Sequence, residues 1–397
     1  PATGASLGPV AEATTADVDA AVKAARGAFD GGKWTSMAPA RRAKILYKMA
    51  QLIGERANDL AMLEVRDNGK ALSTAKGEMG AIVDCFEFYA GACDKLHGET
   101  LPYQAGYTVM TVREPHGVTG HIVPWNYPLQ IFGRSVGAAL AAGNACVVKP
   151  SEDACLSLLR VAALAAEAGL PDGALNIVTG YGTQAGAALA RHPGVDHISF
   201  TGSPGVGTLV AQLAAEHHAP VTLELGGKSP QIVFADADLD AALPTLLAAI
   251  VQNAGQTCSA GSRVLIERAI YAPLVERLSA AFDALRVGPS ALDPDCGPLI
   301  NARQHRRVAQ FIADAERDGV RLAAQGKIVA EAPRGGFYQA PTLFIDVAPQ
   351  HRIAQEEIFG PVLAAMPFDD EAQALALANG TRYGLVAGVW TRDGEIG

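Results

Sequence analysis

Long hydrophobic runs, basic segments and clustered cysteines are all scarce in this sequence, and each scarcity excludes a class of protein. No apolar run reaches the roughly 18 residues that a membrane-spanning helix requires. No charged segment followed by an apolar core stands at the N-terminus, so we identify no signal peptide. The net charge of −9 argues against a nucleic-acid partner, because binding nucleic acid requires a basic face.

The cysteines are few and scattered. Six occur, at positions 85, 93, 146, 155, 258 and 296, and no C-x-x-C pair or histidine cluster accompanies them. This pattern predicts neither a bound metal nor a disulfide framework, and it favours the reducing cytoplasm as the location. The chain has 397 residues, 49% of them apolar, and is long enough for two or three domains.

The N-terminal region has helical periodicity. We predict that Thr15 caps the first helix, because acidic residues follow in its first turn and an apolar stripe begins at Val18. Further helices are predicted around residues 45–53 and 71–94. Residues 98–115 contain alternating Thr, Tyr and Val side chains instead, which predicts a β-hairpin.

From Val118 onward, short apolar strands alternate with helices. The strands predicted in the first alternating series are Val118–Val123, Cys146–Lys149, Leu175–Thr179, His197–Phe200 and Val221–Leu225. A second alternating series begins after Lys228. Such alternation is typical of parallel, doubly wound sheets, in which ligands bind beyond the carboxyl ends of the strands. The predicted fold is therefore α/β, with two doubly wound domains.

Two segments carry the strongest chemical signal. Glu224-Leu-Gly-Gly-Lys-Ser-Pro places a carboxylate beside two glycines. Asn253-Ala-Gly-Gln-Thr-Cys258 places a thiol among small residues that let a substrate approach. A cysteine and a glutamate that meet in one pocket can form an acyl-enzyme and then hydrolyse it. The alternatives are a buried structural thiol at Cys258 and a surface carboxylate at Glu224.

Four further segments accompany this pair. They are Pro124-Trp-Asn-Tyr-Pro128, Gly143-Asn-Ala-Cys-Val-Val-Lys149-Pro-Ser-Glu152, Phe200-Thr-Gly-Ser-Pro-Gly-Val-Gly207 and Glu356-Glu-Ile-Phe-Gly-Pro361. Together, and in this order, the six segments resemble those of the aldehyde dehydrogenase superfamily. The resemblance extends from the region of Val10 to the C-terminus. It implies oxidation of an aldehyde to a carboxylic acid with NAD or NADP.

The resemblance implies three catalytic residues. Cys258 is expected to add to the aldehyde, Asn126 to stabilise the oxyanion, and Glu224 to activate water for thioester hydrolysis. For Asn126 the alternative is a helix N-cap. Rival classes are an acyl-CoA-forming dehydrogenase, a cofactor-free cysteine hydrolase and a protein without activity. Glu224 argues against the first, the cofactor segments against the second, and the intact catalytic residues against the third.

The resemblance also implies a cofactor site, and no metal. Lys149 and Glu152 are expected to bind the adenosine ribose, and the Glu152 carboxylate should repel the 2′-phosphate of NADP, so NAD is the expected cofactor. A capped helix start at Ser151 is the alternative explanation for this pair. The other cofactor-binding candidates are Trp125 after the first strand, Gly202 and Ser203 at the pyrophosphate, and Glu357 and Phe359 at the nicotinamide ribose and ring. Pro204-Gly205 departs from the more usual Thr-Glu of the family.

One position bears on the substrate. Tyr127, Ile131 and Arg134 share one face of the predicted helix, and in the family that face lines the substrate tunnel. An Arg at position 134 resembles the succinate-semialdehyde branch, and a guanidinium suits a carboxylate. A structural or solvent-facing Arg134 is the alternative.

The resemblance finally implies a domain organisation. We expect an NAD-binding domain at 1–97 and 116–226, a bridging hairpin at 98–115 and a catalytic domain at 227–397. Family members continue well past the position of Gly397, so the catalytic domain is expected to be truncated at its C-terminus. A homodimer or homotetramer, joined in part by the hairpin, is the expected assembly.

Overall fold

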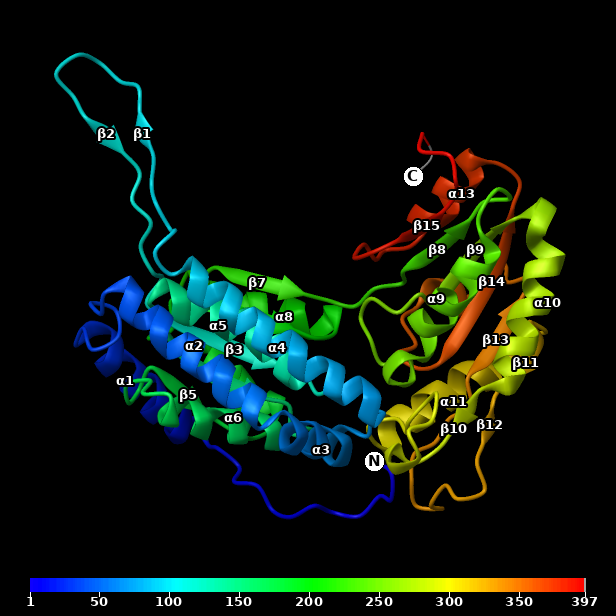
Figure 1. Cartoon of the computed structure of the whole chain (residues 1–397), viewed down its shortest axis with the longest axis horizontal. Helices are drawn as coiled ribbons and strands as arrows, with labels where there is room; N and C mark the ends of the chain where they lie inside the picture. Colours follow the sequence, from blue (N-terminus) through cyan, green and yellow to red (C-terminus); the bar gives the residue numbers. More distant parts are fainter. Residues whose placement is uncertain (396–397) are drawn as a thin grey trace. The chain divides into compact units, whose positions relative to one another are not determined.

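The computed structural model describes residues 1–395, and the chain divides into two compact units (Figure 1). The first unit contains residues 8–67 and 75–224, and the second contains 1–7, 68–74 and the chain from 225 onward. The predicted division at 226–227 falls close to this one. The assignment of a cofactor role to one unit and a catalytic role to the other stays a prediction.

Two short segments that the sequence placed in the first domain pack in the second unit. The Tyr338 hydroxyl donates a hydrogen bond to the Ala2 carbonyl at 2.8 Å. The Ser290 hydroxyl donates one to the Gly69 carbonyl, also at 2.8 Å. Contacts between residues so distant in the chain leave no periodic signal in the sequence. From sequence, these two segments are therefore grouped with their neighbours along the chain, in the first domain.

The first unit is built on a five-stranded parallel sheet. Its strands are β3 (Val118–Val123), β4 (Ala145–Pro150), β5 (Leu175–Ile177), β6 (His197–Thr201) and β7 (Val221–Glu224). Their spatial order is β5-β4-β3-β6-β7, so the chain winds outward from β3 in one direction and then crosses over to β6. The doubly wound α/β fold predicted from the alternating pattern is confirmed.

Helices cover both faces of this sheet. The helices of the unit are α1 (Thr15–Asp30), α2 (Pro39–Glu55), α3 (Ala57–Asn68), α4 (Leu72–Ala92), α5 (Pro128–Ala142), α6 (Leu156–Glu167), α7 (Ala187–Arg191) and α8 (Pro204–Ala215), with a π-helical turn at Gly182–Gly186. On one face α5 packs over β3 and β4 beside α6, and α2 packs against both helices. On the other face Gly120 of β3 lies against Leu189 of α7, which adjoins α8.

The start of α1 corrects one sequence prediction. The N-cap is Thr14 rather than Thr15, and the Thr14 hydroxyl accepts a hydrogen bond from the Asp17 N–H. The Asp17 carboxylate in turn accepts the Thr14 N–H at 2.7 Å, which completes a capping box. Both threonines could cap, but only Thr14 has an acidic side chain three residues later. The sequence reading also missed α3 altogether.

Residues 98–115 form the predicted hairpin. Its strands β1 (Thr100–Leu101) and β2 (Val109–Met110) pair in antiparallel register, and Figure 1 shows the hairpin extending away from the helices of its unit. Its apolar side chains are mostly exposed, including Tyr107 at 68% and Val112 at 69%. A two-stranded hairpin alone is only marginally stable in water, so the pairing of β1 with β2 contributes little stability.

The second unit contains a six-stranded sheet. In spatial order its strands are β11 (Arg321–Gln325), β13 (Thr342–Ile345), β14 (Val362–Phe368), β9 (Arg263–Glu267), β8 (Pro230–Val233) and β15 (Gly388–Trp390). All neighbours pair in parallel except β11 and β13. A separate short pair joins β10 (Arg286–Val287) to β12 (Lys327–Ile328). The sequence did not predict β10, β11 or β12.

Both faces of this second sheet are buried. Its helices are α9 (Leu239–Val251), α10 (Arg268–Ala284), α11 (Ala302–Arg317), α12 (Arg352–Gln355) and α13 (Glu371–Asn379), with 3-10 turns at Gln252–Gly255 and Ser290–Leu292. Along β9, Val264 and Ile266 pack into the cluster formed with α9 and α10, whereas Leu265 packs into the cluster formed with α11. Continuous apolar strands are the signature of parallel strands covered on both sides. No helix within residues 1–395 is long and apolar enough to cross a membrane.

Candidate active site

The winding of the first sheet defines a ligand-binding edge. The strand order reverses between β3 and β6, and ligands of doubly wound sheets bind beyond the carboxyl ends of the strands at such a point. Trp125 and Asn126 follow β3 directly, and Gly202 and Ser203 follow β6. Four residues predicted from the sequence therefore stand at the switch point of one sheet.

Asn126 is buried, with 4% of its surface exposed. The N-cap of α5 is Tyr127, and α5 begins at Pro128, so the alternative that Asn126 caps this helix is wrong. Proline at the first helical position needs no N–H partner and fixes the start of the helix there. Asn126 thus belongs to the turn between β3 and α5 and precedes the N-cap of that helix.

Lys149 and Glu152 form an ion pair at the carboxyl end of β4, with 3.1 Å between Nζ and Oε2. Burial raises the pKa of Glu152, but hydrogen bonds from backbone N–H groups and the Lys149 charge outweigh burial, so the net shift is downward. The helix that follows begins at Leu156 with Cys155 as its N-cap. A capped helix start at Ser151, the structural alternative for this pair, is therefore wrong.

Glu224 ends the edge strand β7 and is exposed. Its carbonyl accepts a hydrogen bond from the Gly202 N–H at 3.0 Å, which ties the end of β7 to the turn after β6. Glu224 and Arg134 line the same pocket of about 420 Å³ within the first unit, together with Ile131 and Ser135 of α5. Tyr127, in contrast, is the buried N-cap residue of α5.

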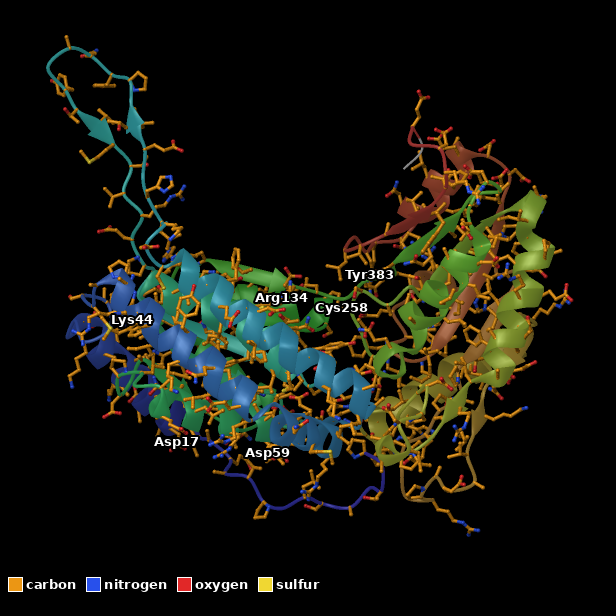
Figure 2. All side chains as sticks on the ribbon, in the orientation of Figure 1. Asp17, Lys44, Asp59, Arg134, Cys258 and Tyr383 are labelled. Atoms are coloured by element: carbon orange, nitrogen blue, oxygen red, sulfur yellow. The ribbon has the colours of Figure 1, made fainter. Side chains whose placement is uncertain are left out.

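Cys258 and Cys85 are the two half-buried cysteines, and Cys85 lies within the helix α4. Cys258 lies on the loop after α9 in the second unit (Figure 2). Burial raises the pKa of Cys85 and Cys93, and raises that of Cys155 to about 11 and those of Cys146 and Cys296 to about 12. A thiol of raised pKa stays protonated at neutral pH and is a poor nucleophile.

The backbone before Cys258 is strained. Asn253 and Ala254 have φ angles of 48° and 55°, which L-residues rarely adopt, and Gly255 follows at 70°. A Cβ at Gly255 would overlap the backbone of Gly360, so only glycine fits against the segment that carries Glu357 and Phe359. Strain of this kind persists only where surrounding contacts hold it, and it is concentrated at functional sites.

Gln256 supplies one of those contacts and was not singled out from the sequence. It is fully buried. Its side-chain N–H donates to the Asn253 carbonyl at 3.0 Å, and its side-chain oxygen accepts the Ile300 N–H at 2.9 Å. The thiol loop is thereby fixed to the body of the second unit. A glutamine two residues before the candidate cysteine was the signal that could have identified it.

Glu357 is held against the glycines of the Glu224 segment. Its carboxylate accepts the Gly227 N–H at 3.2 Å, and a Cβ at Gly226 would overlap that carboxylate. A Cβ at Gly227 would lie 2.6 Å from the Cys258 carbonyl oxygen. The two glycines therefore let the Glu357 carboxylate and the thiol loop approach one backbone turn. The sequence reading explained these glycines only as small neighbours of Glu224.

Phe359 also departs from ordinary backbone geometry, with φ at 60°. Its carbonyl accepts a hydrogen bond from the Gln304 side chain at 2.7 Å.

Within residues 1–395 no cluster of three His, Cys, Asp or Glu side chains is arranged to hold a metal ion.

These features define a class of α/β protein. One unit has a doubly wound sheet whose strand order reverses between β3 and β6, as in dinucleotide-binding folds, and the other unit carries a half-buried cysteine on a strained loop. Comparison with known proteins identifies the family. The model of the aldehyde dehydrogenase family matches residues 1–396, and the chain belongs to that family. The chain is an oxidoreductase that acts on aldehydes with NAD(P).

Individual relatives agree. A putative aldehyde dehydrogenase from Burkholderia cenocepacia has 69% identity and a TM-score of 0.99, over 100% of this chain and 83% of that one. The NAD+ complex of an aldehyde dehydrogenase from Bacillus cereus has 43% identity and a TM-score of 0.97, over 100% and 81%. The putative aldehyde dehydrogenase DhaS of Bacillus subtilis is 44% identical over 395 residues, which are 99% of this chain and 79% of that protein.

Proposed function

We propose that the chain oxidises an aldehyde to a carboxylic acid through a covalent intermediate on Cys258, with NAD as the hydride acceptor. The thiolate adds to the aldehyde carbon and forms a thiohemiacetal. Loss of a hydride from that carbon leaves a thioester, and water then releases the acid and restores the thiol. The observation that carries this proposal is the place of Cys258, a half-buried thiol on a loop that follows three residues of positive φ, whereas Cys85, which is also half-buried, lies within α4.

Two side chains of the first unit are proposed to assist this chemistry. Asn126 donates a hydrogen bond to the oxyanion of the thiohemiacetal, a contribution of roughly 3–4 kcal/mol in comparable sites. Glu224 takes a proton from the water that attacks the thioester. An acyl-CoA-forming dehydrogenase does not need that base, so Glu224 favours hydrolysis.

The residues around the switch point fit NAD. The Lys149 ammonium and the Glu152 carboxylate, 3.1 Å apart, offer a donor and an acceptor to a pair of ribose hydroxyls. A carboxylate at this place repels the 2′-phosphate of NADP. The structure of the Bacillus cereus relative in complex with NAD+ supports the same choice. When bound, NAD supplies the acceptor for the hydride.

Further residues are proposed to hold the remaining parts of NAD. Gly202 and Ser203 stand where α8 begins, and the N–H groups of a helix N-terminus favour a pyrophosphate. Trp125 follows β3 at the same edge of the sheet. Glu357 is proposed to accept hydrogen bonds from the nicotinamide ribose, and Phe359 to contact the ring.

The substrate is proposed to be a semialdehyde with a carboxylate at its far end. Arg134 lines the pocket that Glu224 also lines. Within residues 8–67 and 75–224 no carboxylate pairs with the Arg134 guanidinium, so internal pairing in its own unit does not explain it. Tyr127 stays a predicted substrate contact on the resemblance alone.

Mass spectrometry tests the covalent step directly. The protein is mixed with NAD and succinate semialdehyde, quenched in acid and digested. We expect an acyl group on the peptide that contains Cys258 and none on the peptide that contains Cys85, which serves as the control thiol. Acylation of another cysteine, or turnover without any adduct, would overturn the proposal.

A homo-oligomer is proposed as the working assembly. The exposed apolar side chains of the hairpin, Leu101, Tyr103, Tyr107, Met110 and Val112, have no cover within their unit and suit a neighbouring copy. Sedimentation velocity checks this. A monomer at micromolar concentration would contradict the assembly. The cytoplasmic location stays a prediction.

A further inference from the structure

Lys228 is a buried cation for which the mechanism above has no use. It follows the two glycines of the Glu224 segment, and 2% of its surface is exposed. Its ammonium nitrogen has no hydrogen-bond partner within residues 1–395. Burying an ammonium group without a hydrogen-bond partner is unfavourable, so a lysine buried at this place calls for a functional explanation.

We propose that Lys228 is a positioning residue for the reaction: its ammonium group keeps the Glu357 carboxylate ionised where that carboxylate accepts hydrogen bonds from the cofactor ribose. The proposal rests on the proposed role of Glu357. It concerns how that role is maintained and adds a residue that acts through Glu357 without touching the reacting atoms.

The geometry places Lys228 one residue beyond the contact that holds Glu357. The Gly227 N–H donates to the Glu357 carboxylate at 3.2 Å, and Gly226 leaves the space that the carboxylate fills. The Tyr383 hydroxyl accepts the Glu357 N–H at 3.4 Å. The carboxylate is thus confined from several sides, and its charge has to be balanced inside the protein.

Few other charges face this pair. Arg307 donates to the Glu357 carbonyl at 2.7 Å, but it is exposed and partly screened by solvent. Glu356, which also faces Lys228, is already paired with Arg352 at 2.8 Å. Within residues 1–395 no ion pair joins Lys228 directly to Glu357, so the Lys228 charge acts on the carboxylate at longer range through the buried interior.

Arg263 is the remaining cation close to Lys228, and its donors are committed. Its guanidinium donates to the carbonyls of Lys228, Leu377 and Ala378 at 2.8, 2.7 and 2.8 Å. Arg263 thus holds the end of α13 and cannot neutralise Glu357. It lowers the pKa of Lys228, as does burial, which is the larger cause.

The ionisation of Glu357 and that of Lys228 together determine the pH range in which Lys228 affects cofactor binding. Burial raises the pKa of Glu357, while the Gly227 N–H and the Lys228 charge oppose that rise. Burial lowers the pKa of Lys228 to about 7. Below pH 7 Lys228 is charged, and this is the range in which a carboxyl of raised pKa would otherwise take up a proton. Above pH 7 Lys228 loses its charge, but Glu357 is ionised there without help.

A double-mutant cycle on NAD affinity tests the proposal. The dissociation constant is measured by calorimetry at about pH 5.5 and about pH 8.5 for wild type, Lys228→Met, Glu357→Gln and the double variant. Met fills a similar volume without charge. Far-UV circular dichroism of each variant checks folding.

The expected pattern is specific. Wild type should bind with nearly equal affinity at both pH values. Lys228→Met should match wild type at the higher pH and lose roughly tenfold in affinity at the lower one, because Glu357 becomes protonated there. Glu357→Gln should bind weakly at both values, and the double variant should equal Glu357→Gln.

Two failures are distinguishable. If Glu357→Gln binds NAD as tightly as wild type, the proposed role of Glu357 is wrong. If Glu357→Gln binds weakly but Lys228→Met does not depend on pH, the proposal for Lys228 is wrong. Should Lys228→Met not fold, the infrared difference spectrum between wild type and Glu357→Gln at about pH 5.5 decides. A protonated carboxyl band from Glu357 in wild type overturns the proposal, and its absence supports it.

Discussion

The two units hold their functional residues by different means. In the second unit, backbone conformation positions Cys258 and Glu357. Three consecutive residues with positive φ precede Cys258, and the buried Gln256 side chain holds this loop by a hydrogen bond. Gly226 and Gly227 leave the space in which the Glu357 carboxylate and the Cys258 loop lie. In the first unit, Glu224 and Arg134 are exposed side chains on an edge strand and a helix. The contrast indicates that the backbone of the Cys258 loop tolerates little change, whereas Glu224 and Arg134 can be replaced without disturbing the fold.

The largest effect is expected at the thiol itself. Cys258→Ala should lower turnover more than about a thousandfold, because no covalent intermediate can form. Cys85→Ala, at a half-buried thiol of raised pKa, should leave turnover within about threefold of wild type. The steady-state rate of NADH formation measures turnover in both variants. Similar losses in the two would contradict the proposal that Cys258, and not Cys85, forms the covalent intermediate.

The strained loop provides the next test. Gly255→Ala places a Cβ against Gly360 at a positive φ, so we expect a loss of roughly 1–3 kcal/mol in the free energy of unfolding together with loss of turnover. Gly205→Ala is the matched control, since a Cβ there meets nothing within 4 Å and the residue lies in α8. Urea unfolding should show the control unchanged or slightly more stable. Equal effects in both variants would mean that the loop carries no special constraint.

The substrate side of the comparison is sharpened at Arg134. A charge-assisted hydrogen bond contributes about 1.5–3 kcal/mol, so Arg134→Met should lower kcat/KM for succinate semialdehyde roughly ten- to a hundredfold. The value for butanal should stay within about twofold, because butanal has no carboxylate to lose. If wild type does not prefer succinate semialdehyde over butanal, the proposed role of Arg134 in substrate binding is wrong, and the alternative of a structural or solvent-facing Arg134 holds.

The smallest effect is expected in cofactor choice. Wild type should prefer NAD, and Glu152→Ser should narrow the ratio of kcat/KM for NAD over NADP by about tenfold or less, because it removes repulsion toward the 2′-phosphate. Lys149 keeps its donor in this variant. A wild-type preference for NADP would contradict the proposed role of Glu152.

The same contrast explains what the sequence could predict. Strand β3 begins and ends at the predicted residues, because a short apolar run is a local signal. The fold and the family segments followed from such signals. The contact between Gly226 and Glu357 could not be predicted, since it joins positions 131 residues apart that carry no shared pattern.

Local ambiguity accounts for the smaller errors. Thr14 and Thr15 are both capable caps, and only the Asp17 side chain selects Thr14. The strands β10 and β12 have two residues each, too few for any periodicity to appear. The alternative roles of Asn126 and Ser151 as helix caps were less favoured from sequence but remained open, and they are excluded by where α5 and α6 begin.

The central claim is that the reaction has two steps, with Cys258 carrying the acyl group and Glu224 activating the water that removes it. Rapid mixing of Glu224→Gln with NAD and aldehyde tests this most directly. The account predicts a burst of NADH equal to about one equivalent per active site, followed by steady turnover slowed by roughly a hundredfold or more. A variant in which the burst and the steady rate fall together would contradict the claim, because Glu224 would then act before the thioester forms.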